Sequence, residues 1–420
     1  MTQQIASGEL GHPVLLAGSV AVISDLHLGS GTCVLDEGHH LERLGEFLAA
    51  HDVNVDAFVL NGDLCDFSMA TMRETLTSAR RFLRVIAPRC AEMVYLPGNH
   101  DHHSWLLANE VHELLFHIPD VAEDCVQRTE RMYRSTSLAR LAGDPGRDLM
   151  VAYPNLYWRP PGLSQTTYLF HHGHFCEDLY TIVSDTLTTA FPDEQRQDLE
   201  FLEAANFGWL ELIWYHLGQG GKGIGANGLV ERLYEQVSAQ GPEVLAEGIQ
   251  RLYRARLQPI VHRVLKHEAD ARWWLTEGMA ERVASWLDEH ASRVVISLIS
   301  AYAKQKQETL QPAASRWRFR ELDADLAQHC LAYIQRSVAG SKFLPADDRV
   351  AFFFGHTHVA GMWCQPGQPA LFNDGGWTRG PDGAWPEAHV FKIDGDGAVT
   401  DLYFGERDAD CTVTSIAPFA

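Results

Sequence analysis

The sequence from Val350 to His358 reads Val-Ala-Phe-Phe-Phe-Gly-His-Thr-His, an apolar run that ends in two histidines. The run has the length and composition of a buried β-strand, and the glycine permits a sharp turn at its end. On an extended backbone, residues i and i+2 point to the same side. His356 and His358 can therefore reach one ion together or divide between two.

Four other stretches share this design, in which a short apolar run is followed at once by side chains that bind metals. They are Asp25-Leu-His27, Gly62-Asp63, Gly98-Asn-His-Asp101 and His172-Gly-His174. Each would mean little by itself, but five in one chain predict a dinuclear metal site at the carboxyl ends of neighbouring strands. Asp63 is the natural bridge between two cations because a carboxylate has two oxygens.

The side chains of these stretches also indicate which metals would bind. Imidazole, carboxylate and amide oxygen, the last from Asn99, suit Mn²⁺, Fe or Zn²⁺ better than a thiolate site would. We expect two divalent cations, with Mn²⁺ favoured over Fe and Zn²⁺. Cys65 and Cys176 stand near the motifs, and we expect both to be small buried apolar groups instead of ligands.

With these motifs the chain resembles the calcineurin-like metallophosphoesterases. That family shows Asp-x-His, Gly-Asp, Gly-Asn-His-Asp/Glu, a histidine commonly followed by glycine, and Gly-His-x-His. The resemblance covers about residues 18–175 and 348–405, and residues 373–377, Asn-Asp-Gly-Gly-Trp, resemble a strand end that often follows the last motif. It implies an α/β fold, the four-layer α/β/β/α sandwich of the metallophosphoesterases.

The resemblance also implies a role for each matching residue. His100 would be the acid/base histidine, and Asp101 would orient it. Asp66, His102, His103 and His174 stand beside these motifs and could either orient ligands or lie on the surface. The implied metal ligands are Asp25, His27, Asp63 and His358 for one ion, and Asp63, Asn99, His172 and His356 for the other.

The activity implied is hydrolysis of a phosphate ester by a hydroxide that the two metals activate. We expect a small-molecule or nucleotide- or lipid-linked monoester or diester. One alternative is a pyrophosphatase similar to those of lipid A synthesis, although that group tends to carry arginine at the position of His100. Another is a non-catalytic scaffold that retains the fold, which is disfavoured because no ligand is missing.

Composition limits the partners. A net charge of −21 argues against binding nucleic acid, which needs a basic surface, so a small phosphorylated substrate is expected. Eight scattered cysteines without a Cys-x-x-Cys indicate reduced thiols and a cytoplasmic location. No stretch is long and apolar enough for a transmembrane helix or has the form of a signal peptide. The oligomeric state is left open.

The pattern of the chain predicts two parts. Residues 1–175 and 345–420 would form the catalytic domain, and residues 176–344 a large all-α insertion that acts as a lid or accessory domain. The tail from about residue 408 is expected to be peripheral. Strands are expected at 20–24, 57–60, 93–96, 149–153, 167–171, 350–354, 370–373, 389–393 and 399–404. Helices are expected at 41–51, 70–86, 110–117, 179–191, 193–217, 229–238, 243–267, 273–290, 291–304 and 324–338.

Overall fold

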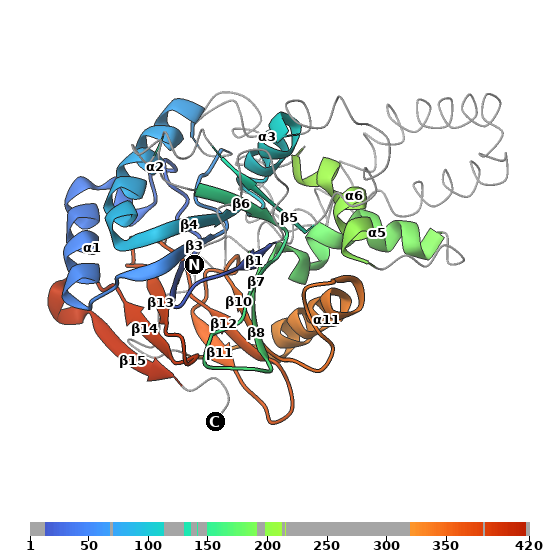
Figure 1. The fold of residues 1–420 in the computed structure, drawn as a ribbon. Helices are drawn as coiled ribbons and strands as arrows, with labels where there is room; N and C mark the ends of the chain where they lie inside the picture. The colour runs from blue at the N-terminus through green and yellow to red at the C-terminus, as the bar shows by residue number, and fades with distance from the viewer. Residues whose placement is uncertain are drawn as a thin grey trace.

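A computed structural model describes residues 13–67, 70–112, 130–135, 141, 149–190, 198–211, 215, 320–380 and 383–416. Its strands form two sheets that pack face to face, and helices cover the outer side of each sheet (Figure 1). The expected four-layer α/β/β/α sandwich is therefore confirmed.

The larger sheet has eight strands in the order β15-β14-β13-β2-β3-β4-β6-β5. Its four central strands, β2, β3, β4 and β6, run parallel, and the strands on either side of them are antiparallel. The bounds are β2 Val20–Ile23, β3 Val55–Asn61, β4 Cys90–Leu96, β5 Arg131–Arg134, β6 Leu149–Tyr153, β13 His389–Ile393, β14 Val399–Tyr403 and β15 Thr412–Ile416.

The smaller sheet has seven strands in the order β1-β7-β8-β10-β12-β11-β9. β8 and β10 are parallel neighbours, although the chain between them, from Phe170 to Arg349, also contributes β9 to the far edge of this sheet. β9 lies within the segment 176–344, which was expected to be all-α. The bounds are β1 Val14–Leu15, β7 Leu156–Trp158, β8 Thr166–Phe170, β9 Arg320–Glu321, β10 Arg349–Phe354, β11 Gly361–Trp363 and β12 Ala370–Asn373.

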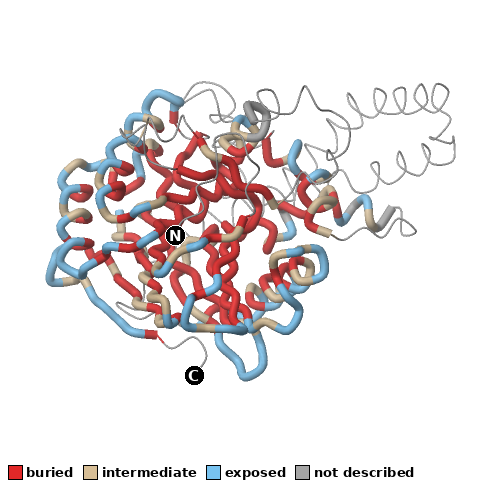
Figure 2. The backbone as a smooth tube through the Cα atoms, in the orientation of Figure 1, coloured by how far each residue is buried: buried red, intermediate tan, exposed pale blue. Residues whose placement is uncertain are grey.

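Side chains alternate along the central strands, so each strand contributes to the apolar core on both faces of its sheet. In β2, Val20 and Val22 pack between the two sheets, whereas Ala21 and Ile23 face the helices. This is the period of two expected of a strand buried on both sides. Figure 2 shows the consequence, a continuous buried interior through both sheets, with exposed residues mainly on the outer helices, the turns and the edge strand β15.

Of the α-helices that the structure describes, three contact the larger sheet, namely α1 (Gly38–Ala50), α2 (Met72–Ile86) and α3 (His103–His112), and three lie on the side of the smaller one. α2 begins at a capping box between Thr71 and Glu74. α5 (Asp178–Ala190), α6 (Leu199–Leu210) and α11 (Ala324–Gly340) share a core with the smaller sheet.

Two expectations about the elements were wrong. The short helix expected at 110–117 begins earlier, as α3 (His103–His112), because Ser104 N and Trp105 N already donate to the carbonyls of Asp101 and His102. The tail is not peripheral, since β15 pairs with β14 at the sheet edge. Its β-branched residues suit an extended chain, and an unpaired edge offers it hydrogen bonds.

Much of the expected insertion lies outside the described residues, including the helices expected at 229–238, 243–267, 273–290 and 291–304. The helices expected at 179–191 and 324–338 are confirmed as α5 and α11, and α6 lies within the range 193–217. Among the helices that the structure describes, none combines the length and the apolar composition that a membrane span requires.

Candidate metal centre

The expected ligands lie together where the two sheets meet. Asp25, Asp63 and Asn99 follow β2, β3 and β4, which are adjacent parallel strands of the larger sheet. His172 and His356 follow β8 and β10, adjacent parallel strands of the smaller sheet. Both sheets therefore present their carboxyl ends to one buried centre, as α/β sheets generally do.

One group of ligand atoms comprises Asp25, His27 and His358. The Nε2 atoms of His27 and His358 are 3.0 Å apart, and His358 Nε2 is 3.3 Å from Asp25 Oδ1. Two atoms bound to one ion at about 2.1 Å lie about 3.0–3.4 Å apart, depending on octahedral or tetrahedral geometry. These distances therefore fit a shared cation.

A second group comprises Asp63, His172 and His356, with Asn99 beside it. His172 Nε2 is 3.2 Å from Asp63 Oδ2 and 3.0 Å from Asn99 Oδ1, again the spacing of atoms around one ion.

Asp63 lies between the two groups. Its Oδ2 is 3.5 Å from His27 Nε2 in one group and 3.2 Å from His172 Nε2 in the other. This oxygen is fully buried, and none of the described side chains meets it with good hydrogen-bond geometry. A buried carboxylate oxygen in that position is costly unless a cation binds it, so the residues fit two bridged metal ions.

The second nitrogen of three histidines is held by an acceptor. His27 Nδ1 lies 3.2 Å from Asp66 Oδ2, His172 Nδ1 lies 3.2 Å from the carbonyl of Asn61, and His358 Nδ1 lies 3.2 Å from Thr378 Oγ1. Ligating histidines almost always donate their other N–H to such a partner, which leaves the Nε2 lone pair for the metal.

Two glycines that precede ligands lie so close to other ligand side chains that a larger residue would not fit. A Cβ on Gly62, whose φ is +95°, would overlap the His172 ring, and a Cβ on Gly355 would overlap the Asp25 carboxylate. Glycine permits this close approach because it has no side chain.

The backbone at the ligands is also unusual. Asp25, His27, Asp63, His356 and His358 all have φ between 46° and 69°, the left-handed region that non-glycine residues seldom adopt. Such conformations cluster at functional sites, where the surrounding structure imposes them.

Burial and charge together set the protonation of the centre. Burial raises the pKa of the Asp63 carboxyl, but His172 and His100 outweigh burial and hold it below its usual range. Burial lowers the pKa of His172, yet Asp63 and Asp25 raise it to about 9. The buried carboxylates thus favour positive charge nearby. When no cation is bound, the protonated imidazole of His172 supplies that charge.

Asp66, and not the expected Asp101, is the carboxylate found close to the His100 ring. His100 Nδ1 is 3.2 Å from Asp66 Oδ1, and the other oxygen of Asp66 contacts His27. Asp101 instead accepts backbone N–H groups from Cys65 (3.0 Å) and Gly98 (2.7 Å), so it holds the two loops together. The sequence did not separate the two carboxylates because each lies close to a motif.

Residues 373–377 form hydrogen bonds with the segments that carry the ligands. Asn373 Nδ2 donates to the Gly355 carbonyl at 2.7 Å, and Trp377 N donates to the Asp25 carbonyl at 3.0 Å. Asp374 accepts a hydrogen bond from Ser24 at 2.6 Å. These contacts fix the loops that carry Asp25 and His356.

Residues of α5 and α6 close the centre on its outer side, and sequence patterns did not reveal them. Glu177, next to α5, has Oε2 3.3 Å from His356 Nε2, and the Tyr180 hydroxyl accepts a hydrogen bond from Asn99 Nδ2 at 3.2 Å. No short motif marks either residue. The only signal is that they follow closely on His172 and His174.

His102 is held between two glutamates of the same wall. Its Nδ1 is 2.7 Å from Glu211 Oε1 and its Nε2 is 3.0 Å from Glu203 Oε1. Burial lowers the pKa of His102, but Glu203 and Glu211 raise it to about 9. The Tyr153 hydroxyl donates to Glu203 at 2.8 Å and also contacts His174 Nε2 at 3.3 Å.

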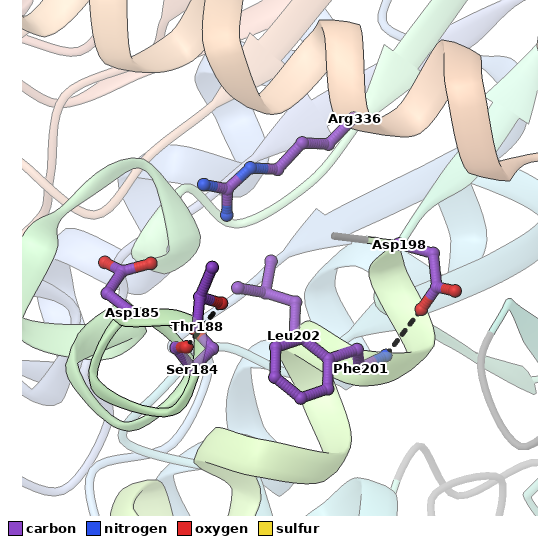
Figure 3. A pocket seen from close by; sticks show the side chains of 7 residues that line it. All are labelled: Ser184, Asp185, Thr188, Asp198, Phe201, Leu202 and Arg336. Atoms are coloured by element: carbon purple, nitrogen blue, oxygen red, sulfur yellow. Dashed lines mark hydrogen bonds between the residues drawn. The ribbon is translucent and has the colours of Figure 1, made fainter. Parts of the chain in front are cut away.

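A small cavity lies between α5, α6 and α11 (Figure 3). Arg336 reaches over it from α11, with Asp185 and Thr188 on α5. None of its lining residues belongs to the two ligand groups.

Three comparisons with known proteins give different results. No curated protein sequence matches the chain. The structure is similar to a crystal structure of phosphopantetheinyl hydrolase (PptH) from Mycobacterium tuberculosis, with 12% sequence identity, 85% of this chain and 89% of that chain covered, and a TM-score of 0.25. The family model for calcineurin-like phosphoesterases matches residues 18–237, more than half of the chain. The chain belongs to the calcineurin-like phosphoesterase family.

Proposed function

We propose that the chain hydrolyses a phosphate ester with two divalent cations bridged by Asp63. The observation that carries this proposal is the position of Asp63 Oδ2, which lies within 3.5 Å of an imidazole Nε2 from each ligand group. A single metal ion would account for only one of the two ligand groups.

The proposed ligands divide as the resemblance implies. Bound there, the cations would supply Lewis acidity to the phosphoryl oxygens and lower the pKa of a water molecule. The ligands are Asp25, His27, Asp63 and His358 for one ion, and Asp63, Asn99, His172 and His356 for the other.

His100 is the proposed proton donor. Burial lowers its pKa, but Asp66 and Asp63 raise it to about 9, so these two carboxylates favour the protonated ring. With Nδ1 held by Asp66, the proton on Nε2 is the one transferred to the leaving oxygen. Asp66 takes the orienting role that the sequence suggested for Asp101.

The donor set supports Mn²⁺, with Fe and Zn²⁺ as alternatives, because it contains nitrogen and oxygen without sulfur. Cys65 and Cys176 are buried among apolar side chains, and burial raises the pKa of both thiols well above its usual range. They are poor ligands, as expected from the sequence.

We also propose that residues 176–344 are an insertion into a catalytic domain formed by 1–175 and 345–420. The parallel pairing of β8 with β10 supports this division, because these adjacent strands flank the segment, whose strand β9 joins only the edge of the sheet. The substrate we propose is a small phosphorylated molecule, since a net charge of −21 disfavours a polyanion. Free thiols at all the described cysteines support a cytoplasmic location.

Metal removal tests the proposal. The protein is stripped with a chelator, its metal content is measured by mass spectrometry, and hydrolysis of p-nitrophenyl phosphate, bis-p-nitrophenyl phosphate and a nucleotide pyrophosphate is followed with and without added Mn²⁺. We expect two ions per chain and activity that returns only with metal. Full activity of the stripped protein would refute the mechanism, and two bound ions without turnover of any ester would favour a non-catalytic scaffold.

A further inference from the structure

Tyr180 contacts the one proposed ligand whose two ends are chemically different. An asparagine amide can ligate a cation through its oxygen but not through its NH₂ group. Asn99 Oδ1 faces His172 Nε2 at 3.0 Å, on the side of the second ligand group. Its Nδ2 points the other way and donates to the Tyr180 hydroxyl at 3.2 Å.

Tyr180 is placed firmly enough to act on this amide. It lies in the first turn of α5 and is 1% exposed. Its ring packs edge-on against His356, with centroids 4.9 Å apart at 79°, and against His174 at 6.0 Å. The hydroxyl is therefore fixed by a ring that is itself held between histidines of the centre.

We propose that Tyr180 is a positioning residue that holds the Asn99 amide with its oxygen toward the second metal ion. The inference rests on the proposed two-metal function and extends it, because the contact comes from the first helix of the segment 176–344. On this account that helix is part of the metal centre and not only a cover over it. Without the hydroxyl, the amide can rotate about its last side-chain bond, and its oxygen faces the ion for only part of the time.

The test is Tyr180→Phe, which keeps the ring and removes the oxygen. Mn²⁺ is titrated into the metal-free protein, and free Mn²⁺ is followed by electron paramagnetic resonance, a measurement that does not depend on activity. We expect one of the two binding steps to weaken by roughly 10–100-fold, the usual effect of removing an outer partner of a ligand. An unchanged isotherm would overturn the proposal.

Tyr168→Phe is the matched control. Tyr168 is also fully buried, and its hydroxyl donates to the Gly397 carbonyl at 2.7 Å, but it belongs to the core between the sheets. We expect this variant to bind both Mn²⁺ ions like the parent. Equal weakening by both substitutions would show a general loss of stability and would also overturn the proposal.

Asn99→Asp separates positioning from any other role of Tyr180. A carboxylate presents an oxygen at either end, so it needs no partner to choose between them. In an Asn99→Asp background, Tyr180→Phe should change the Mn²⁺ affinity by less than about twofold, whereas additive losses would refute an action through Asn99.

The parent protein separates failure of this inference from failure of the proposed function. If the parent protein binds no Mn²⁺, the proposed function fails. If it binds two ions and only the Tyr180 effect is missing, the positioning role fails alone.

Discussion

The inner and outer sides of the metal centre are built in different ways. On the inner side, loops at the ends of β2, β3, β4, β8 and β10 aim nitrogen and oxygen atoms at common points. On the outer side, α5 and α6 contribute buried groups that touch those loops, such as Tyr180 at Asn99 and Glu203 at His102. The comparison suggests that the inner side determines the chemistry and the outer side the geometry in which it occurs.

The strongest test of this division is Asp63→Ala, which removes the only group shared by both ligand sets. We expect metal content and turnover to be lost together, with turnover falling by roughly 10⁴-fold or more. Asp56→Ala is the control at the opposite end of β3, where the exposed Asp56 accepts hydrogen bonds from Gly18 N and Ser19 N. Retained activity in Asp63→Ala would remove the basis for a bridged centre.

The next largest effect is expected from His100→Ala, which separates proton transfer from metal binding on the inner side. Turnover should fall by roughly 10²–10⁴-fold while two ions remain bound. Metal content and kcat are measured on the same sample. Loss of an ion would instead make His100 a ligand, since its ring nitrogen lies near those of His27 and the carboxylate of Asp66.

A smaller effect is expected from Asp66→Asn, which keeps the shape but removes the charge held against His27 and His100. We expect activity or metal affinity to fall by roughly 10–100-fold. Asp101→Asn is the comparison, since Asp101 accepts backbone N–H groups and should mainly affect thermal stability. If Asp101→Asn impaired turnover more than Asp66→Asn at equal stability, the two roles would have to be exchanged.

The smallest expected effect concerns the outer side. The pKa of His102 is about 9 in the fold and 6.5 is its ordinary value, so its protonated form is stabilised by folding. That contribution is complete below about pH 6.5 and disappears as pH rises through 9. The free energy of unfolding, compared with His102→Gln, should therefore decrease by about 1 kcal/mol per pH unit in this window. If the free energy of unfolding changed equally with pH in the parent and in His102→Gln, the contacts with Glu203 and Glu211 would not hold a charged imidazole.

The inner side could be predicted because its information is local. Asp25 and His27 are two residues apart on one strand end, and every other ligand follows an apolar run that the sequence displays. The segments 149–153, 370–373 and 389–393 were predicted with the same bounds that the strands have. Period-two burial and strand-end placement are enough to bring such residues to one edge.

The outer side could not be predicted, because its contacts join residues far apart in the chain. Asn99 and Tyr180 are separated by 81 positions, and His102 and Glu211 by 109. No spacing rule connects such pairs, since their proximity depends on how α5 and α6 pack. The same limit explains why Asp101 was assigned to His100, whose partner Asp66 lies on a different loop.

The left-handed backbone at Asp25, His27, Asp63, His356 and His358 has a consequence for the evolution of this scaffold. Each such conformation costs a residue with a side chain about 1 kcal/mol or more relative to glycine. A descendant that no longer needed its metals would gain stability by accepting glycine or asparagine at these five positions. The five side chains of the proposed metal centre are thus held in a backbone conformation that lowers the stability of the fold.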